Sequence, residues 1–196
     1  MILAIDVGNT NLVLALGSEA GSVDSVWRIS TDAVTSADAC SKAIRKTLGT
    51  KLEEVDNSVI ASVVPAITRH VATAMEGVTG RAPLVVGEIG VDLGIAVNID
   101  RPEQAGADRV VNAVGAQVHH QLPAVILDFG TATTLDLVGA DGAYEGGIIA
   151  PGVALSIEAL ERAAAQLPKL ELRAFGDDLP VLGKNTVAAM ESGVFW

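Results

Sequence analysis

The feature that most constrains this chain is a strand-and-turn pattern that occurs twice. The segments ILAIDVGNTN and AVILDFGTAT start at Ile2 and Ala124 of a 196-residue sequence. Each runs from an apolar stretch through Asp, one apolar residue and Gly into small, hydroxyl or amide residues. An apolar run that ends at a glycine-containing turn predicts a β-hairpin. Two copies favour a duplicated fold, in which equivalent turns face each other.

The remaining periodicity predicts a mixed α/β chain, because short apolar runs alternate with helical spacing. Predicted strands cover residues 2–7, 12–16, 23–30, 59–64 and 84–87. Predicted helices cover residues 36–48, 65–80 and 154–168; Gly77 or Gly80 ends the second, and the third ends before Pro168. A further helix carries Asp108 and Arg109 in its first turn and an apolar stripe of Val110, Val111, Val114 and Val118. A loop is predicted over 169–186, before a last helix that Asn185 or Thr186 caps.

Composition excludes several classes of protein. Hydrophobic residues make up 49% of the chain but only six are aromatic, which suits buried strands covered by Ala-rich helices. The net charge of -11 argues against a nucleic-acid partner, since phosphate contacts need clustered Lys and Arg. Cys40 is the only cysteine, so neither an internal disulfide nor a cysteine zinc site is expected. No apolar run predicts a signal peptide or a membrane span, and we expect a soluble cytoplasmic protein.

The two repeated aspartates are candidates for phosphate and metal chemistry. Asp6 and Asp128 each end a predicted strand, where a carboxylate is ionised and lies at the mouth of a cleft. Such a carboxylate can hold a hydrated Mg²⁺ or a monovalent cation while N–H groups of the turn bind phosphate oxygens. The turns add hydroxyl donors and room for the backbone: Thr10, Thr131, Thr133, Gly8 and Gly130. The alternative is that each Asp only accepts bonds from its own turn.

Asp108 and Arg109 form a second candidate pair. An Arg binds carboxylates through two parallel hydrogen bonds, so Arg109 could orient a small carboxylate substrate. Asp108 would then accept the proton of that substrate's hydroxyl. The alternative is an acidic residue that only stabilises the start of a helix. The GKNT segment (183–186) is either an anion contact or a plain helix cap, and no Walker, Rossmann or G-x-S-x-G motif occurs.

Six motifs in order closely resemble the type III pantothenate kinases, which form 4'-phosphopantothenate at the first step of coenzyme A synthesis. They are IDVGNTN, ASVVP, GADRVVNA, DFGTATTLD, GGIIAPG and GKNTVAAMESGVFW. The resemblance implies a duplicated, ribonuclease-H-like (actin-like) fold, with an N-terminal domain over 1–118 and a partial C-terminal domain over 119–196. It also implies a homodimer that binds ATP between its domains, with Mg²⁺ and a monovalent cation, K⁺ or NH₄⁺.

The resemblance assigns a role to each motif residue. Asp108 would be the catalytic proton acceptor, and Asp128 would hold the monovalent cation. ATP would be bound by Asp6, Val7, Gly8, Asn9, Thr10, Asn11, Leu12, Val13 and Thr131. Pantothenate would be bound by Gly106, Ala107, Asp108, Arg109 and Thr186.

The sequence departs from the family pattern at two places. Many relatives carry a substrate-contacting tyrosine just before the GADR motif, where this chain has Ile99. Relatives also continue beyond the position of Trp196, so a catalytically silent nucleotide-binding relative stays open as an alternative. A third alternative is another actin-fold enzyme, such as a sugar kinase or an exopolyphosphatase, although the GADR and GKNT segments count against it.

Overall fold

A computed structural model describes residues 1–164, 167–171 and 179–195. The chain divides into two compact units. The first unit combines Met1–Ala124 with Leu137–Gly146, and the second combines Val125–Asp136 with Gly147–Trp196. Within the described residues, no helix has both the length and the apolar character needed to cross a membrane.

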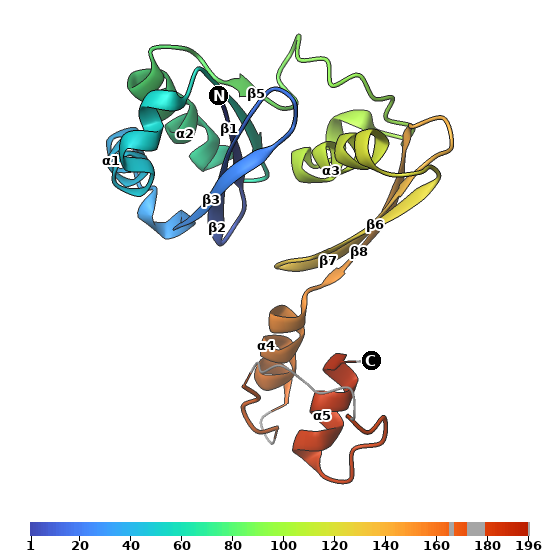
Figure 1. The fold of residues 1–196 in the computed structure, drawn as a ribbon. Coiled ribbons are helices and arrows are strands. Elements are labelled where there is room, and N and C mark those ends of the chain that lie inside the picture. Colours follow the sequence, from blue (N-terminus) through green and yellow to red (C-terminus); the bar gives the residue numbers. More distant parts are fainter. Residues whose placement is uncertain (165–166, 172–178, 196) are drawn as a thin grey trace. The chain divides into compact units, whose positions relative to one another are not determined.

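The first unit is built on a five-stranded sheet with the order β3-β2-β1-β4-β5 (Figure 1). The strands are β1 (Ile2–Val7), β2 (Asn11–Gly17), β3 (Val23–Ser30), β4 (Asn57–Ser62) and β5 (Leu84–Val85). β1 pairs antiparallel with β2 and parallel with β4. The opening repeat therefore forms the predicted hairpin, and β1 lies at the centre of the sheet.

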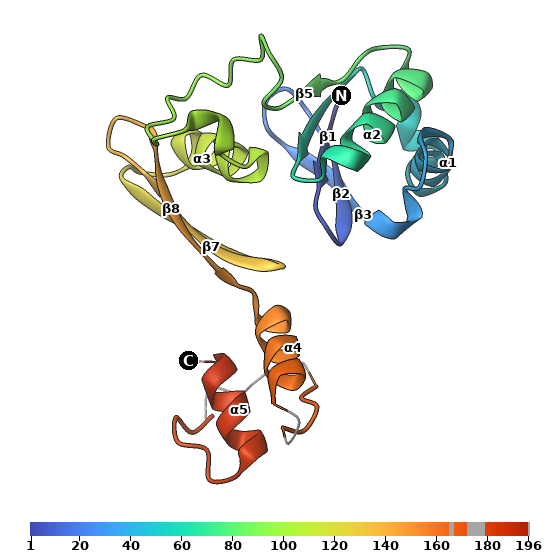
Figure 2. The same ribbon diagram turned by 180° about the vertical axis from the view of Figure 1, so that it is seen from behind.

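Two helices cover one face of this sheet, as Figures 1 and 2 show from opposite sides. Helix α1 (Ala37–Leu48) begins where the Ser36 hydroxyl accepts a bond from the Ala39 N–H, at 3.1 Å. Helix α2 (Pro65–Thr79) has Pro65 in its first turn and ends at Gly80 in a left-handed conformation. Their apolar stripes pack with alternate residues of β1 and β2 to form the core, which includes Cys40.

Helix α3 (Ala107–His119) also belongs to the first unit and packs against β4. Its buried residues are Val110, Ala113 and Ala116. Of the four predicted valines, Val110 is buried and Val111 and Val114 are partly buried, whereas Val118 is 67% exposed, so the stripe is wrong at its last member. The small alanines lie on the packed face, which allows close approach of the neighbouring element. Three short 3₁₀ helices complete the connections: η1 (Thr31–Ala33), η2 (Gly49–Glu54) and η3 (Pro102–Gln104).

A three-stranded sheet in the order β6-β7-β8 follows. Its strands are β6 (Ala124–Phe129), β7 (Ala132–Val138) and β8 (Tyr144–Pro151). Ala124 and the segment Leu137–Gly146, which holds the end of β7, the turn and the start of β8, are assigned to the first unit, and the rest of the sheet to the second. The second unit also contains α4 (Val153–Ala163) and α5 (Thr186–Phe195), which share a small core of Ile157, Leu170 and Met190. The helix predicted over 154–168 thus ends earlier, at Ala163, and residues 165 and 166 lie outside the described part. The loop predicted over 169–186 is also only partly described.

The two copies of the repeat form similar local structures but differ in burial. Both fold as a strand that ends at a glycine turn. In β1, Leu3, Ile5 and Val7 are buried in the core under α1 and α2. The corresponding residues of β6 are exposed, and Phe129 reaches 69%. The local sequence pattern therefore determines the strand and turn in both copies. Burial differs because helices α1 and α2 pack on the strand of the first copy.

Candidate active site

The turn between β1 and β2 is held by its own backbone and by Thr31. The Gly8 N–H donates to the Asn11 carbonyl at 3.0 Å, which closes the turn. The buried Thr31 hydroxyl donates to the Gly8 carbonyl at 2.8 Å, and its N–H donates to the Thr10 carbonyl at 3.0 Å. A Cβ at Gly8 would lie 3.2 Å from the Asn11 oxygen, so glycine suits this position. The turn is therefore a fixed surface feature.

Asp6 lies on the face of β1 opposite the core. Because Ile5 and Val7 point into the core and side chains alternate along a strand, Asp6 points the other way and is exposed. It pairs with Val13 of β2 and with Ala61 of the parallel strand β4. The carboxyl ends of adjacent parallel strands are the common place for ligands in α/β folds.

Apart from Thr131, the other predicted ATP-binding residues lie along the same hairpin with different accessibility. Asn9 and Thr10 are exposed at the turn. Val7 and Leu12 are fully buried, so their side chains shape the core rather than the surface. Any ligand contact from those two residues would use the backbone.

The Asp108 carboxylate folds back onto the first turn of α3. Its Oδ1 accepts a hydrogen bond from the Arg109 N–H at 2.8 Å. A Cβ at Gly106 would lie 2.5 Å from this oxygen, so a larger residue there would displace the carboxylate. A carboxylate at this position is stabilised by the N-terminal end of the helix dipole. Gly106 and Ala107 thus provide the space and the helix start that position Asp108.

The Arg109 side chain contacts a residue that sequence reasoning did not single out. Its guanidinium carbon lies over the ring of Tyr144, 5.7 Å from the ring centroid. Both residues belong to the first unit. A contact between residues so distant in sequence has no local pattern, and the only available signal is that Tyr144 is the single tyrosine of the chain.

Asp128 and Thr131 lie at the turn between β6 and β7 in the second unit. Asp128 is exposed on β6, and the Gly130 N–H donates to the Ala132 carbonyl at 2.9 Å. The Gly152 N–H donates to the Thr131 carbonyl at 3.0 Å, and a Cβ at Gly152 would collide with the carbonyl oxygens of Gly130 and Thr131. The GGIIAPG motif therefore fixes the turn of the second repeat through Gly152.

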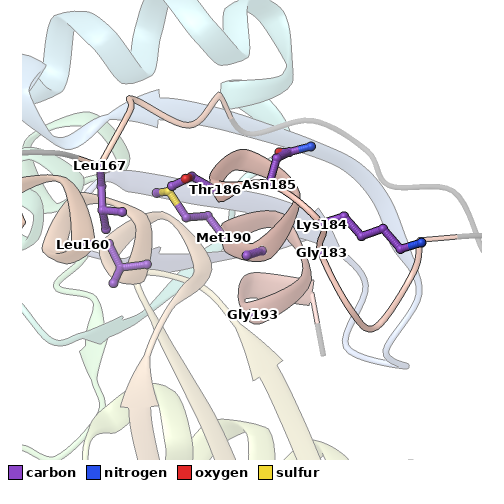
Figure 3. Close-up of a pocket in the computed structure, with 9 residues that line it drawn as sticks. Leu160, Leu167, Gly183, Lys184, Asn185, Thr186, Met190 and Gly193 are labelled. Carbon is purple, nitrogen blue, oxygen red and sulfur yellow. The ribbon is translucent and has the colours of Figure 1, made fainter.

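Thr186 is the first residue of α5, and the Asn185 side chain caps this helix. The Asn185 Oδ1 accepts from the Ala188 N–H at 2.9 Å, which agrees with one of the two predicted caps. A pocket of about 600 Å³ lies beside this helix start, with Lys184 and Thr186 on its border and Leu160 and Met190 among its apolar residues (Figure 3).

The predicted site residues thus fall into two sets. Asp6 with its hairpin and Asp108 with Arg109 belong to the first unit, whereas Asp128, Thr131 and Thr186 belong to the second. Among the described residues, no three His, Cys, Asp or Glu side chains are placed to hold one metal ion. A metal held by a single carboxylate together with phosphate oxygens and water remains compatible with this arrangement.

Comparison with known proteins gives a consistent result. A protein-family model described as type III pantothenate kinase matches residues 2–196. Type III pantothenate kinases of Paramagnetospirillum magneticum and Rhodospirillum centenum are each 46% identical over 199 aligned residues, which cover 100% of this chain and 75% of each relative.

A solved structure shows a related fold. A Baf family protein from Campylobacter jejuni superimposes with a TM-score of 0.58 at 19% identity, over 98% of this chain and 73% of that one. At this identity the likeness concerns the fold alone.

Proposed function

Because the chain belongs to the type III pantothenate kinase family, we propose that it transfers the γ-phosphoryl group of ATP to the terminal hydroxyl of pantothenate. The main support is that the family model matches residues 2–196 and that relatives are 46% identical across the whole chain. On this ground the chain is a pantothenate kinase. The alternative, a catalytically silent relative that only binds nucleotide, is not favoured. It spans about three quarters of the length of these relatives.

We assign the ATP phosphates to the β1–β2 turn. Support comes from the fixed backbone at Gly8, the exposed Asn9 and Thr10, and the exposed Asp6 at the strand end. Mg²⁺ in kinases is commonly held by one or two carboxylates with the substrate phosphates, so Asp6 fits as its protein ligand. When bound there, Mg²⁺ would neutralise charge that develops on the phosphate oxygens.

The proposed chemical step uses Asp108 and Arg109. Arg109 binds the pantothenate carboxylate and thereby orients the far end of the substrate. Asp108 accepts the proton of the terminal hydroxyl as that oxygen attacks the γ-phosphorus and ADP departs. The hydrogen bond from the Arg109 N–H holds one Asp108 oxygen, which directs the carboxylate before substrate arrives. Gly106 and Ala107 complete the substrate contacts through the start of α3.

The second unit supplies the remaining proposed contacts. Thr131 binds phosphate at a turn that Gly152 fixes, and Thr186 binds pantothenate at the start of α5. Asp128 holds a monovalent cation, K⁺ or NH₄⁺, which its exposed carboxylate suits. A weakly bound cation of this kind offsets phosphate charge.

We further propose a duplicated, ribonuclease-H-like arrangement with domains over 1–118 and 119–196. The recurrence of a strand, an Asp and a glycine turn in both halves supports it. A cytoplasmic homodimer is proposed by analogy with the family.

The reaction can be tested by following ADP release with and without pantothenate, and by identifying the product by mass spectrometry. We expect turnover only with pantothenate and a mass increase of one phosphoryl group. Nucleotide binding without turnover would instead support a silent relative. Turnover with a sugar or polyphosphate in place of pantothenate would support another actin-fold enzyme.

A further inference from the structure

We propose that Tyr144 is a positioning residue that holds the Arg109 guanidinium in the orientation that accepts the pantothenate carboxylate. The inference rests on the proposed function of Arg109. It adds a residue that lies outside all six sequence motifs assigned to substrate or nucleotide.

The first argument is the direct contact between the two side chains. The guanidinium carbon lies 5.7 Å from the centroid of the Tyr144 ring, within the range of a cation–π interaction. Tyr144 is 1% exposed, and such interactions strengthen when water is excluded. An arginine side chain has many rotamers, so a buried aromatic partner reduces the freedom that binding would otherwise remove.

The second argument is that the Tyr144 backbone is itself fixed on both sides. Its N–H donates to the Ala96 carbonyl at 2.9 Å, and its carbonyl accepts from the Asn98 N–H at 2.8 Å. The Asn98 amide also donates to the Glu145 carboxylate at 3.0 Å. These hydrogen bonds with residues 96 and 98 hold the start of β8 in place. The Tyr144 ring that contacts Arg109 therefore has little freedom to move.

The third argument concerns geometry at the guanidinium. A guanidinium carries five N–H donors, more than one ring contact can use. A carboxylate binds at the edge, through two parallel hydrogen bonds in the guanidinium plane. One guanidinium can therefore contact the ring and bind a carboxylate at the same time, and the ring can preorganise it for the substrate.

The kinetic test compares Tyr144→Leu with Tyr144→Phe. We expect Tyr144→Leu to raise KM for pantothenate about tenfold, because an ordered cation–π contact is lost, and Tyr144→Phe to restore the wild-type value. KM for ATP and kcat should change little in either variant. Trp27→Leu is the matched control, because Trp27 is another aromatic residue packed on the first unit's core. It should leave KM for pantothenate unchanged.

A second measurement covers the case in which Tyr144→Leu does not fold. Since Tyr144 is the only tyrosine, 3-fluorotyrosine labelling gives one ¹⁹F resonance. We expect this resonance to shift when pantothenate is added and when Arg109 is changed to Gln.

Two results would overturn the inference: an unchanged KM in a folded Tyr144→Leu protein, or a resonance indifferent to both pantothenate and Arg109→Gln. Wild-type protein without pantothenate-dependent turnover would instead count against the proposed function.

Discussion

Asp108 and Arg109 are neighbours in sequence but are held by different parts of the first unit. One oxygen of Asp108 is held by the Arg109 backbone N–H, whereas the Arg109 side chain lies over Tyr144. This separation of the two side chains supports the proposal that the adjacent pair serves two ends of one substrate. The close approach of the Asp108 oxygen to Gly106 shows why a glycine stands two residues before it.

The base assignment predicts a loss of rate in Asp108→Asn. We expect kcat to fall about 100-fold or more, because an amide cannot accept the hydroxyl proton. KM for ATP should change little. The measurement is steady-state kinetics with pantothenate and ATP each varied.

Asp38→Asn is a matched control, because Asp38 also occupies the first turn of a helix and carries the same charge. Its partner is Lys42, at 2.7 Å on the exposed face of α1. We expect an unchanged kcat. Wild-type turnover by Asp108→Asn would rule out Asp108 as the base.

The cation assignment predicts a change in salt dependence in Asp128→Asn. If Asp128 holds a monovalent cation, removing the charge of its side chain should weaken activation by K⁺. The K⁺ concentration that gives half-maximal activity should then rise. Activity measured against KCl, with ionic strength kept constant by a tetraalkylammonium salt, checks this. The same K⁺ response in both proteins would place the cation elsewhere.

At the scale of elements, sequence predicted what local chemistry controls. Helix α1 follows Ser36, and α2 starts at Pro65 and ends at Gly80, the later of its two predicted ends. The strand over Val23–Ser30 is observed as predicted. The predicted valine stripe of α3 is wrong at Val118, because the side that packs depends on the neighbouring element, and here the buried residues include two alanines. Helix α4 ends at Ala163, well before Pro168. A proline sets the last position that a helix can reach, but it does not make the helix extend that far.

The β1–β2 turn depends on Thr31, the first residue of the 3₁₀ helix η1 that follows β3. Replacing Thr31 with Val removes the hydroxyl bond to the Gly8 carbonyl but keeps the backbone bond to Thr10. We expect the free energy of unfolding to fall by about 1 kcal/mol, because a part-buried carbonyl loses its partner. KM for ATP should rise several-fold. Urea unfolding and nucleotide kinetics measure the two effects.

Thr79→Val is the control for this change. The Thr79 hydroxyl donates to the Met75 carbonyl at 2.8 Å near the end of α2, away from the turn. It should lose some stability with no change in KM for ATP. Equal effects of the two variants on KM would contradict a specific role for Thr31.

At the scale of the whole molecule, Cys40 reports on the integrity of the first unit. It is the only cysteine and is fully buried in that core, and burial raises the pKa of its thiol from 9.0 to about 11. A protonated, inaccessible thiol does not react with disulfide reagents. We expect the labelling of Cys40 at pH 8 to increase in step with the unfolded fraction of this unit across a urea titration. Rapid labelling of the folded protein would contradict this burial.

The same shift predicts a pH dependence of stability. Between pH 9 and about 11 the unfolded thiol loses its proton while the folded thiol keeps it. The unfolded state is therefore favoured, and stability should fall across this window. The difference between wild type and Cys40→Ala isolates the contribution of the thiol from other groups. A difference that stays constant from pH 8 to 11 would contradict the shift.

Amino-acid order alone was enough for the two hairpin signals, the helix caps and the motifs that indicate the family. These depend on residues near one another in the chain, such as Asp6 with Gly8 or Asp108 with Arg109. Folding in three dimensions was needed to bring Tyr144 against Arg109, Thr31 against Gly8, and Gly152 against Thr131. Such contacts join distant segments, and nothing in the local spacing of residues encodes which segments will meet.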